Sequence, residues 1–181
     1  SEVVSGAAAY TGAATSATAA GTYTITPAIG SLSATNYNFT PFVDGTLVIN
    51  ISTSTITVNG SIVTGSTSFT YTGLPQGPST SIVTGSTGSV TYSYVGTGAT
   101  SYAASATKPT NAGTYSVTAT VAADGNYYAA TSSATAFVIS PSNSTITVTG
   151  FTSFTYTGLA QGPSTSTVTG STGAVTYNYV G

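Results

Sequence analysis

The side chains that carry out most catalytic and metal-binding chemistry are nearly absent from this sequence. It contains no histidine, no cysteine, one cation (Lys108) and three carboxylates, Glu2, Asp44 and Asp124. Serine is plentiful, but a serine nucleophile needs a base within hydrogen-bond distance, and the chain has no histidine to supply one. We therefore expect no enzyme activity and no catalytic, cofactor-binding or metal-binding residues.

Two charged positions have an alternative interpretation. Asp124-Gly125-Asn126 is faintly similar to a calcium loop, but such loops gather about six to eight oxygens from several carboxylates, and Asp124 has no acidic neighbour in the sequence. A turn between two strands is the favoured interpretation. Lys108 could form an isopeptide bond, but no partner carboxylate is evident, and we favour a lysine that lies along a loop before Pro109 with its ammonium in water.

The thirteen tyrosines could also form a binding surface, because aromatic rings offer flat apolar area for stacking on sugars. Most of them alternate with Val and Ile, which favours packing in a core and across strands. Tyr128 is out of phase with this alternation and is the tyrosine to inspect for exposure. Four Asn-X-Ser/Thr motifs permit glycan attachment, although such motifs arise by chance in a chain so rich in Ser and Thr; they begin at Asn38, Asn50, Asn59 and Asn143.

The composition excludes several classes of protein. Charged residues make up 2% of the chain, against about 25% in an ordinary cytosolic domain, which favours an extracellular protein. A single cation cannot neutralise the phosphates that a nucleic-acid-binding protein contacts. No apolar run approaches the roughly 18 residues that a membrane span needs. Without cysteine, stability has to come from packing and strand pairing rather than from disulfides.

Internal repetition is the strongest signal in the sequence. The segment Ser68–Gly96 recurs as Ser153–Gly181, and the copies differ only at the pairs Pro75/Ala160, Ile82/Thr167, Ser89/Ala174 and Ser93/Asn178. Near-identical copies at a domain-sized spacing are typical of tandem arrays. In addition, residues 61–67 duplicate residues 81–87, which predicts an enlarged surface loop or a bulged strand in the first copy.

Apolar residues alternate with Ser and Thr at a period of two, and Gly, Asp-Gly and Asn-Gly interrupt the runs. This pattern is typical of half-buried antiparallel strands joined by turns, and no window sustains a helical period. The sequence therefore predicts an all-β sandwich without helices. We expect strands near Thr55–Val58, Ser68–Thr72, Val90–Val95, Tyr102–Ala106, Thr114–Val121 and Ala134–Ile139.

Asn111–Val117 resembles the start of strand F in immunoglobulin-like domains, where a Gly-x-Tyr run enters the strand. The resemblance implies that the Tyr115 hydroxyl bonds back to the nearby backbone in a tyrosine corner. Gly21–Ile25 matches Gly113–Val117. On this basis we expect tandem immunoglobulin-like repeats with half-modules at both ends: strands E to G of one module in residues 1–50, a complete module in 51–140, and strands A to C of the next in 141–181.

Each half-module would leave strand edges uncovered, so we expect neighbouring repeats to complete them. Two arrangements remain open at this point. Either the residues are a window on a much longer polypeptide, or separate chains exchange halves.

The Gly-Thr-Tyr motif, the turns Tyr71–Pro78 and Tyr156–Pro163, and Tyr102–Pro109 together resemble the MBG-type immunoglobulin-like repeats of large Bacteroidota surface adhesins. The resemblance implies a non-catalytic structural segment of an extended filament on the bacterial cell surface, often exported by type IX secretion. The alternative is a carbohydrate- or protein-binding module that contacts surface glycans or a substratum.

Overall fold

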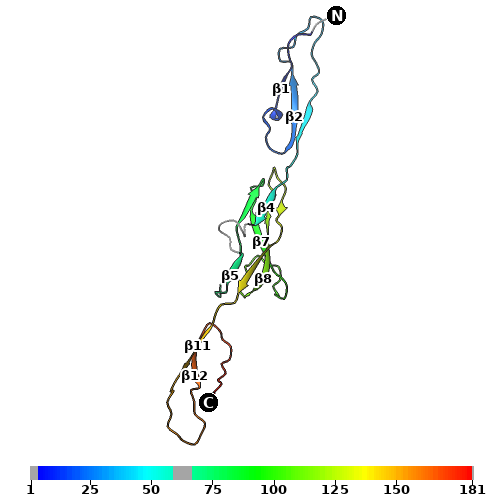
Figure 1. The fold of residues 1–181 in the computed structure, drawn as a ribbon. Coiled ribbons are helices and arrows are strands. Elements are labelled where there is room, and N and C mark those ends of the chain that lie inside the picture. Colours follow the sequence, from blue (N-terminus) through cyan, green and yellow to red (C-terminus); the bar gives the residue numbers. More distant parts are fainter. Residues whose placement is uncertain (1–3, 59–66, 181) are drawn as a thin grey trace.

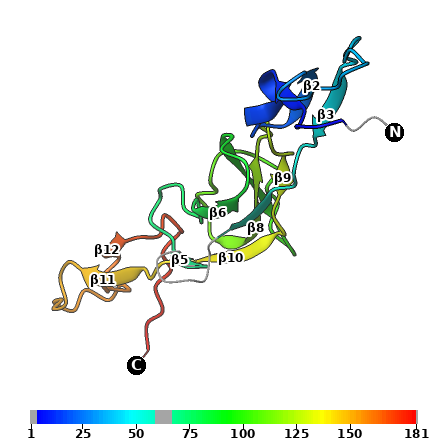
Figure 2. The same ribbon diagram turned by 90° about the horizontal axis from the view of Figure 1, so that it is seen from above.

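The computed structural model describes residues 4–58 and 67–180, and it is almost entirely β-structure. Three bodies follow one another along one line (Figures 1 and 2). We name them the N-terminal body (residues 4–50), the central unit (51–140) and the C-terminal body (141–180). The expected enlarged loop at 61–67 falls largely on residues outside the described ranges.

The N-terminal body is a single three-stranded antiparallel sheet in the order β1-β2-β3. Strand β2 is the middle strand: Tyr23 pairs with Leu47 of β3, and Thr26 pairs with Thr11 of β1. A short 3-10 turn, η1, follows β1 where the sequence predicted no helix; Gly12 precedes it with a positive φ of 96°. The elements are β1 (Ala9–Thr11), η1 (Ala13–Ser16), β2 (Gly21–Ala28) and β3 (Gly45–Ile49).

The central unit packs a two-stranded sheet against a five-stranded one in a sandwich-like arrangement. The larger sheet has the order β5-β10-β8-β7, with β9 also paired to β8, and the smaller sheet joins β4 to β6. Its strands are β4 (Thr55–Val58), β5 (Ser68–Thr70), β6 (Ser81–Thr84), β7 (Val90–Gly96), β8 (Gly113–Val121), β9 (Ala130–Thr131) and β10 (Thr135–Ser140).

Strand β8 is the centre of the core. Its alternate residues Tyr115, Val117, Ala119 and Val121 are at most 2% exposed, as the period of two in a strand requires. Tyr115 and Val117 pack with residues of β7 and β10, namely Tyr94, Phe137 and Ile139. Ala119 and Val121 pack with Ile56 of the smaller sheet. The Phe137 ring stacks on Tyr115 and meets Tyr94 edge-on, at centroid distances of 5.4 and 6.2 Å.

The C-terminal body contains one antiparallel pair, β11 (Thr145–Thr149) and β12 (Thr165–Thr169). This pair repeats the pairing of β4 with β6: Thr55 lies opposite Thr84, and Thr145 lies opposite Thr169. Residues 153–155 and 175–180, whose counterparts form β5 and β7 in the central unit, form no strand here.

The all-β prediction is confirmed, but three details of the expected strands are wrong. Strand β5 pairs with β10 in parallel, whereas antiparallel strands were expected. Strand β4 pairs with β6, a strand that the sequence analysis did not predict. Residues 102–106 form only an isolated bridge between Ser105 and Tyr94. The Tyr94 N–H bonds Ser105 O, whereas the Gly96 N–H bonds Tyr102 O, so the two hydrogen bonds differ in register by one residue and no ladder develops.

The tyrosine-corner hydrogen bond is present: the Tyr115 hydroxyl donates to Asn111 O at 2.8 Å. Tyr23 makes the equivalent bond to Ala19 O at 2.9 Å. Both hydroxyls therefore tie the entry of a strand to the loop that precedes it. The surroundings differ, because Tyr115 is buried in the core and Tyr23 is half-buried on a sheet without a buried side chain among its described residues.

This difference predicts unequal effects of removing the two hydroxyls. Tyr115→Phe should lower the free energy of unfolding of the central unit by about 1 kcal/mol, because Asn111 O loses the donor of a part-buried hydrogen bond. Tyr23→Phe, the matched control, should leave this transition unchanged. Urea unfolding followed by tyrosine fluorescence measures both, and equal losses in the two variants would contradict the assignment.

Candidate functional site

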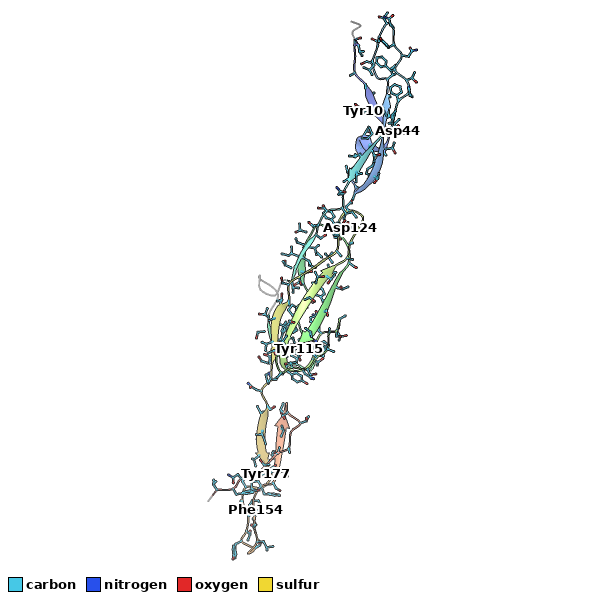
Figure 3. The ribbon with its side chains drawn as sticks, turned by 90° about the vertical axis from the view of Figure 1, so that its right-hand side faces the viewer. Tyr10, Asp44, Tyr115, Asp124, Phe154 and Tyr177 are labelled. Carbon is cyan, nitrogen blue, oxygen red and sulfur yellow. The ribbon has the colours of Figure 1, made fainter. Side chains whose placement is uncertain are left out.

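The charged residues do not converge in the described part of the chain, and no group of three or more His, Cys, Asp or Glu side chains occurs there. Asp124 and Tyr115 mark opposite ends of the central unit (Figure 3). Lys108 lines the same surface depression as Tyr115, together with Thr, Ser and Ala residues, and its Nζ donates to Ser79 Oγ at 2.9 Å. Lys108 and Asp124 therefore lie at opposite ends of the central unit, so these two residues cannot form an isopeptide bond with each other.

Asp124 organises a turn, as the favoured interpretation of the sequence predicted. Its Oδ1 accepts the N–H groups of Asn126 and Tyr127, and its Oδ2 accepts the Thr87 N–H and hydroxyl, at 2.8 to 3.1 Å. These donors, first of all the Thr87 N–H, lower the pKa of Asp124 to about 2. The ionised carboxylate thus holds the β8–β9 loop against the loop that precedes β7.

The lowered pKa of Asp124 predicts that the folded state loses stability in acid. Because the pKa is lower in the folded state than the ordinary value of 3.8, the stabilisation is complete above about pH 4 and is lost as the pH falls towards 2. Thermal unfolding followed by circular dichroism should show a melting temperature that falls over this interval. Asp124→Asn should lower the melting temperature at pH 7 and flatten its dependence on pH, whereas Asp44→Asn, at an exposed position, should do neither.

The junction between the N-terminal body and the central unit is held by hydrogen bonds from the Asp124 turn. The Asn126 side chain accepts the Ala20 N–H at 2.6 Å, while Asn126 O accepts the Ser52 N–H at 2.8 Å. The Tyr128 N–H then donates to Ser52 O at 2.9 Å. One short loop therefore contacts both the first residues of the central unit and the preceding body, a connection that the sequence alone did not predict.

The exposed tyrosines of the central unit do not gather into a stacking surface. Tyr128 is 55% exposed and lies at the junction with the N-terminal body, whereas Tyr71 is 41% exposed and its N–H bonds Ser140 O near the exit to the C-terminal body. Tyr94 and Tyr115 are core residues, and burial raises the pKa of Tyr94 to about 12. Three of the four possible glycan acceptors, Asn38, Asn50 and Asn143, are exposed, and Asn59 lies outside the described residues.

The most unusual surfaces are the apolar side chains of the two outer bodies. Neither body contains a buried residue among those described. Tyr10 of the N-terminal body and Phe154 of the C-terminal body, both labelled in Figure 3, are 63% and 46% exposed. Exposed fractions of 60% or more occur at Tyr10, Tyr37, Val43, Phe151, Tyr156, Leu159, Tyr179 and Val180. Apolar surfaces of this kind usually mark sites of protein association.

Comparison of the chain with models of protein families, with characterised proteins and with solved structures finds no match. No helix in the described residues is long and apolar enough to cross a membrane.

Proposed function

We propose that this chain is a structural repeat segment of an extended extracellular filament or adhesin and that its modules are immunoglobulin-like. The observation that carries the proposal is the linear succession of three bodies, two of which contain near-identical copies of one sequence, with a hydrogen bond to Asn126 at the first junction (Figure 1). A tandem array of such units gains length with each repeat, and its geometry is set at the junctions.

The strand order of the central unit supports the immunoglobulin-like part of the proposal. Strands β10, β8 and β7 are neighbours in the order that strands G, F and C have in that fold. Strand β4 pairs with β6, so we assign β6 as strand B in place of the expected segment Ser68–Thr72, which forms β5 and pairs with β10. The Tyr115 hydrogen bond to Asn111 O lies at the expected position for a tyrosine corner. Aliphatic and aromatic packing occupies the place of the disulfide and tryptophan of antibody domains, since the chain has no Cys and no Trp.

The membership in the MBG-type repeats and the location on a bacterial surface rest on the sequence motifs and the very low charge. The alternative function, a sugar- or protein-binding module, has less support because Tyr71 and Tyr128 lie at opposite ends of the central unit. A structural filament, unlike a sugar-binding module, needs no cluster of exposed tyrosines.

Electron microscopy of intact producing cells with a gold-labelled antibody against the central unit tests the proposed function. We expect gold particles along thin filaments outside the cell envelope, because an array presents the same unit many times. Labelling confined to the cell interior would contradict the proposal. Cells that lack the gene provide the control.

The Asn126 junction makes a separate prediction about stiffness. Asn126→Ala removes the acceptor of the Ala20 N–H and should let the N-terminal body swing relative to the central unit. Small-angle X-ray scattering at low concentration should show a broader distribution of interatomic distances than for the natural chain. Asn38→Ala, at an exposed asparagine within the N-terminal body, should leave the distribution unchanged. Identical curves for all three proteins would exclude a role for this contact.

A further inference from the structure

The Asp124 carboxylate determines where Asn126 lies on the central unit. Asp124 Oδ1 accepts the N–H groups of Asn126 and Tyr127 at 2.8 and 2.9 Å, while the Asp124 N–H donates to Tyr127 O at 3.0 Å. These bonds close the turn on itself, as aspartate side chains do in many turns. Asp124 Oδ2 accepts the N–H and the hydroxyl of Thr87, so the closed turn is also fixed to the loop that precedes β7.

Asn126 connects this turn to the preceding body. Its Oδ1 accepts the Ala20 N–H at 2.6 Å. Ala20 is itself held in place, because the neighbouring Ala19 O accepts the Tyr23 hydroxyl at 2.9 Å and β2 begins at the next residue. A continuous series of hydrogen bonds therefore runs from the Asp124 carboxylate to the middle strand of the N-terminal body.

The same turn makes the other contacts described at this junction. The Ser52 N–H and O bond Asn126 O and the Tyr128 N–H, which fixes the first residues of the central unit to the turn. No strand ladder and no aromatic ring contact joins the two bodies among the residues that the structure describes. The orientation of the N-terminal body therefore depends on the shape of one turn.

We propose that the ionised Asp124 carboxylate is the positioning group of this junction, and that its protonation releases the N-terminal body to swing about the central unit. Hydrogen bonds to an ionised acceptor are about twice as strong as those between neutral groups. A protonated carboxyl also has one oxygen that donates, whereas the partners of Asp124 at both oxygens are donors. Protonation therefore breaks at least one of these bonds and weakens the others. The inference goes beyond the proposed function, because a junction of this kind is acid-sensitive whether or not the chain forms a filament.

No other charged group of the described residues faces Asp124. The titratable side chains of its own turn are Tyr127 and Tyr128, which stay neutral in acid. The three segments that contact the turn contain only Ile, Ser, Thr, Gly and Ala; they are residues 17–20, 51–54 and 85–89. Lys108 lies at the opposite end of the central unit, and Asp44 lies in the N-terminal body (Figure 3). An effect of acid on the junction is therefore attributable to Asp124.

The direction of the pH effect follows from the lowered pKa of Asp124. The hydrogen-bond donors, first of all the Thr87 N–H, lower this pKa from 3.8 to about 2 in the folded state, so the ionised form belongs to the held junction. The junction is therefore fully held above about pH 4 and is released as the pH falls through about 2.

Spin labels can measure the hinge directly, because the natural chain contains no cysteine. Labels at Thr46→Cys of β3 and Thr91→Cys of β7, two exposed positions, report the distance between the two bodies by pulsed electron paramagnetic resonance. A second pair, Thr57→Cys and Thr91→Cys, lies within the central unit and reports whether that unit stays folded. We expect the first pair to give a narrow distance distribution at pH 7 that widens at least about twofold at about pH 2, while the second pair keeps its width.

Two substitutions separate the carboxylate from the contact that it positions. Asp124→Ala removes both acceptor oxygens and should widen the distribution between the bodies about twofold at pH 7 and abolish its dependence on pH. Asn126→Ala should widen it as much, and the double variant no further, because both substitutions interrupt one series of bonds. Asp44→Asn, the matched control, should behave as the natural chain does.

Several results would overturn the inference. The first label pair would keep a narrow distribution at about pH 2, or both pairs would widen together, which would mean that acid acts on the whole fold and not on the hinge. A distribution at pH 7 as broad in the natural chain as in Asn126→Ala would show that the junction is not held. If Asp124→Ala disrupts the central unit, the second label pair reveals it, and the acid titration of the natural chain decides the question.

Discussion

The pairing of β8 with β7 on one side and β10 on the other is the interaction on which this structure depends. It brings Tyr94, Tyr115, Val117 and Phe137 together from three strands, and these side chains are four of the five buried residues of the larger core cluster. Strand β7 precedes a long connection to β8, so the core requires segments from both halves of the repeat. In the two outer bodies no described side chain is buried, and residues of the same kinds lie at the surface.

Hydroxyl groups and aromatic rings make many of the stabilising contacts among the described residues. Tyrosine hydroxyls bond backbone carbonyls at Ala19, Pro78, Thr107, Asn111 and Pro163. Each bond fixes a loop next to a strand, and the buried bond from Tyr94 to Pro78 O contributes about 1 kcal/mol. The one carboxylate in the central unit, Asp124, serves in the same way, because all its contacts are with neutral donors of neighbouring loops.

The sequence predicted the all-β class and most strands because alternation reports which face of a strand is buried, and β8 shows this alternation without interruption. It missed β6, because Ser81–Thr84 has two adjacent apolar residues and no clear alternation. It also assigned a strand at 102–106, where the backbone contacts slip by one residue. The pairing of β5 with β10 and the contact between Asn126 and Ala20 join residues that are far apart in the chain. A local sequence pattern contains no information about such contacts. The domain boundaries at 50 and 140 and the absence of catalytic residues stay predictions.

The parallel pairing of β5 with β10 affects how the central unit bears load. The chain leaves this unit through the end of β10, and β10 lies between β5 and β8. A pull applied to the chain beyond the end of β10 acts on this strand lengthwise, so its ladder hydrogen bonds to both neighbours are loaded together in shear rather than opened one after another. Resistance to stretching is thus built into the strand order, and it needs neither a disulfide nor an ion pair.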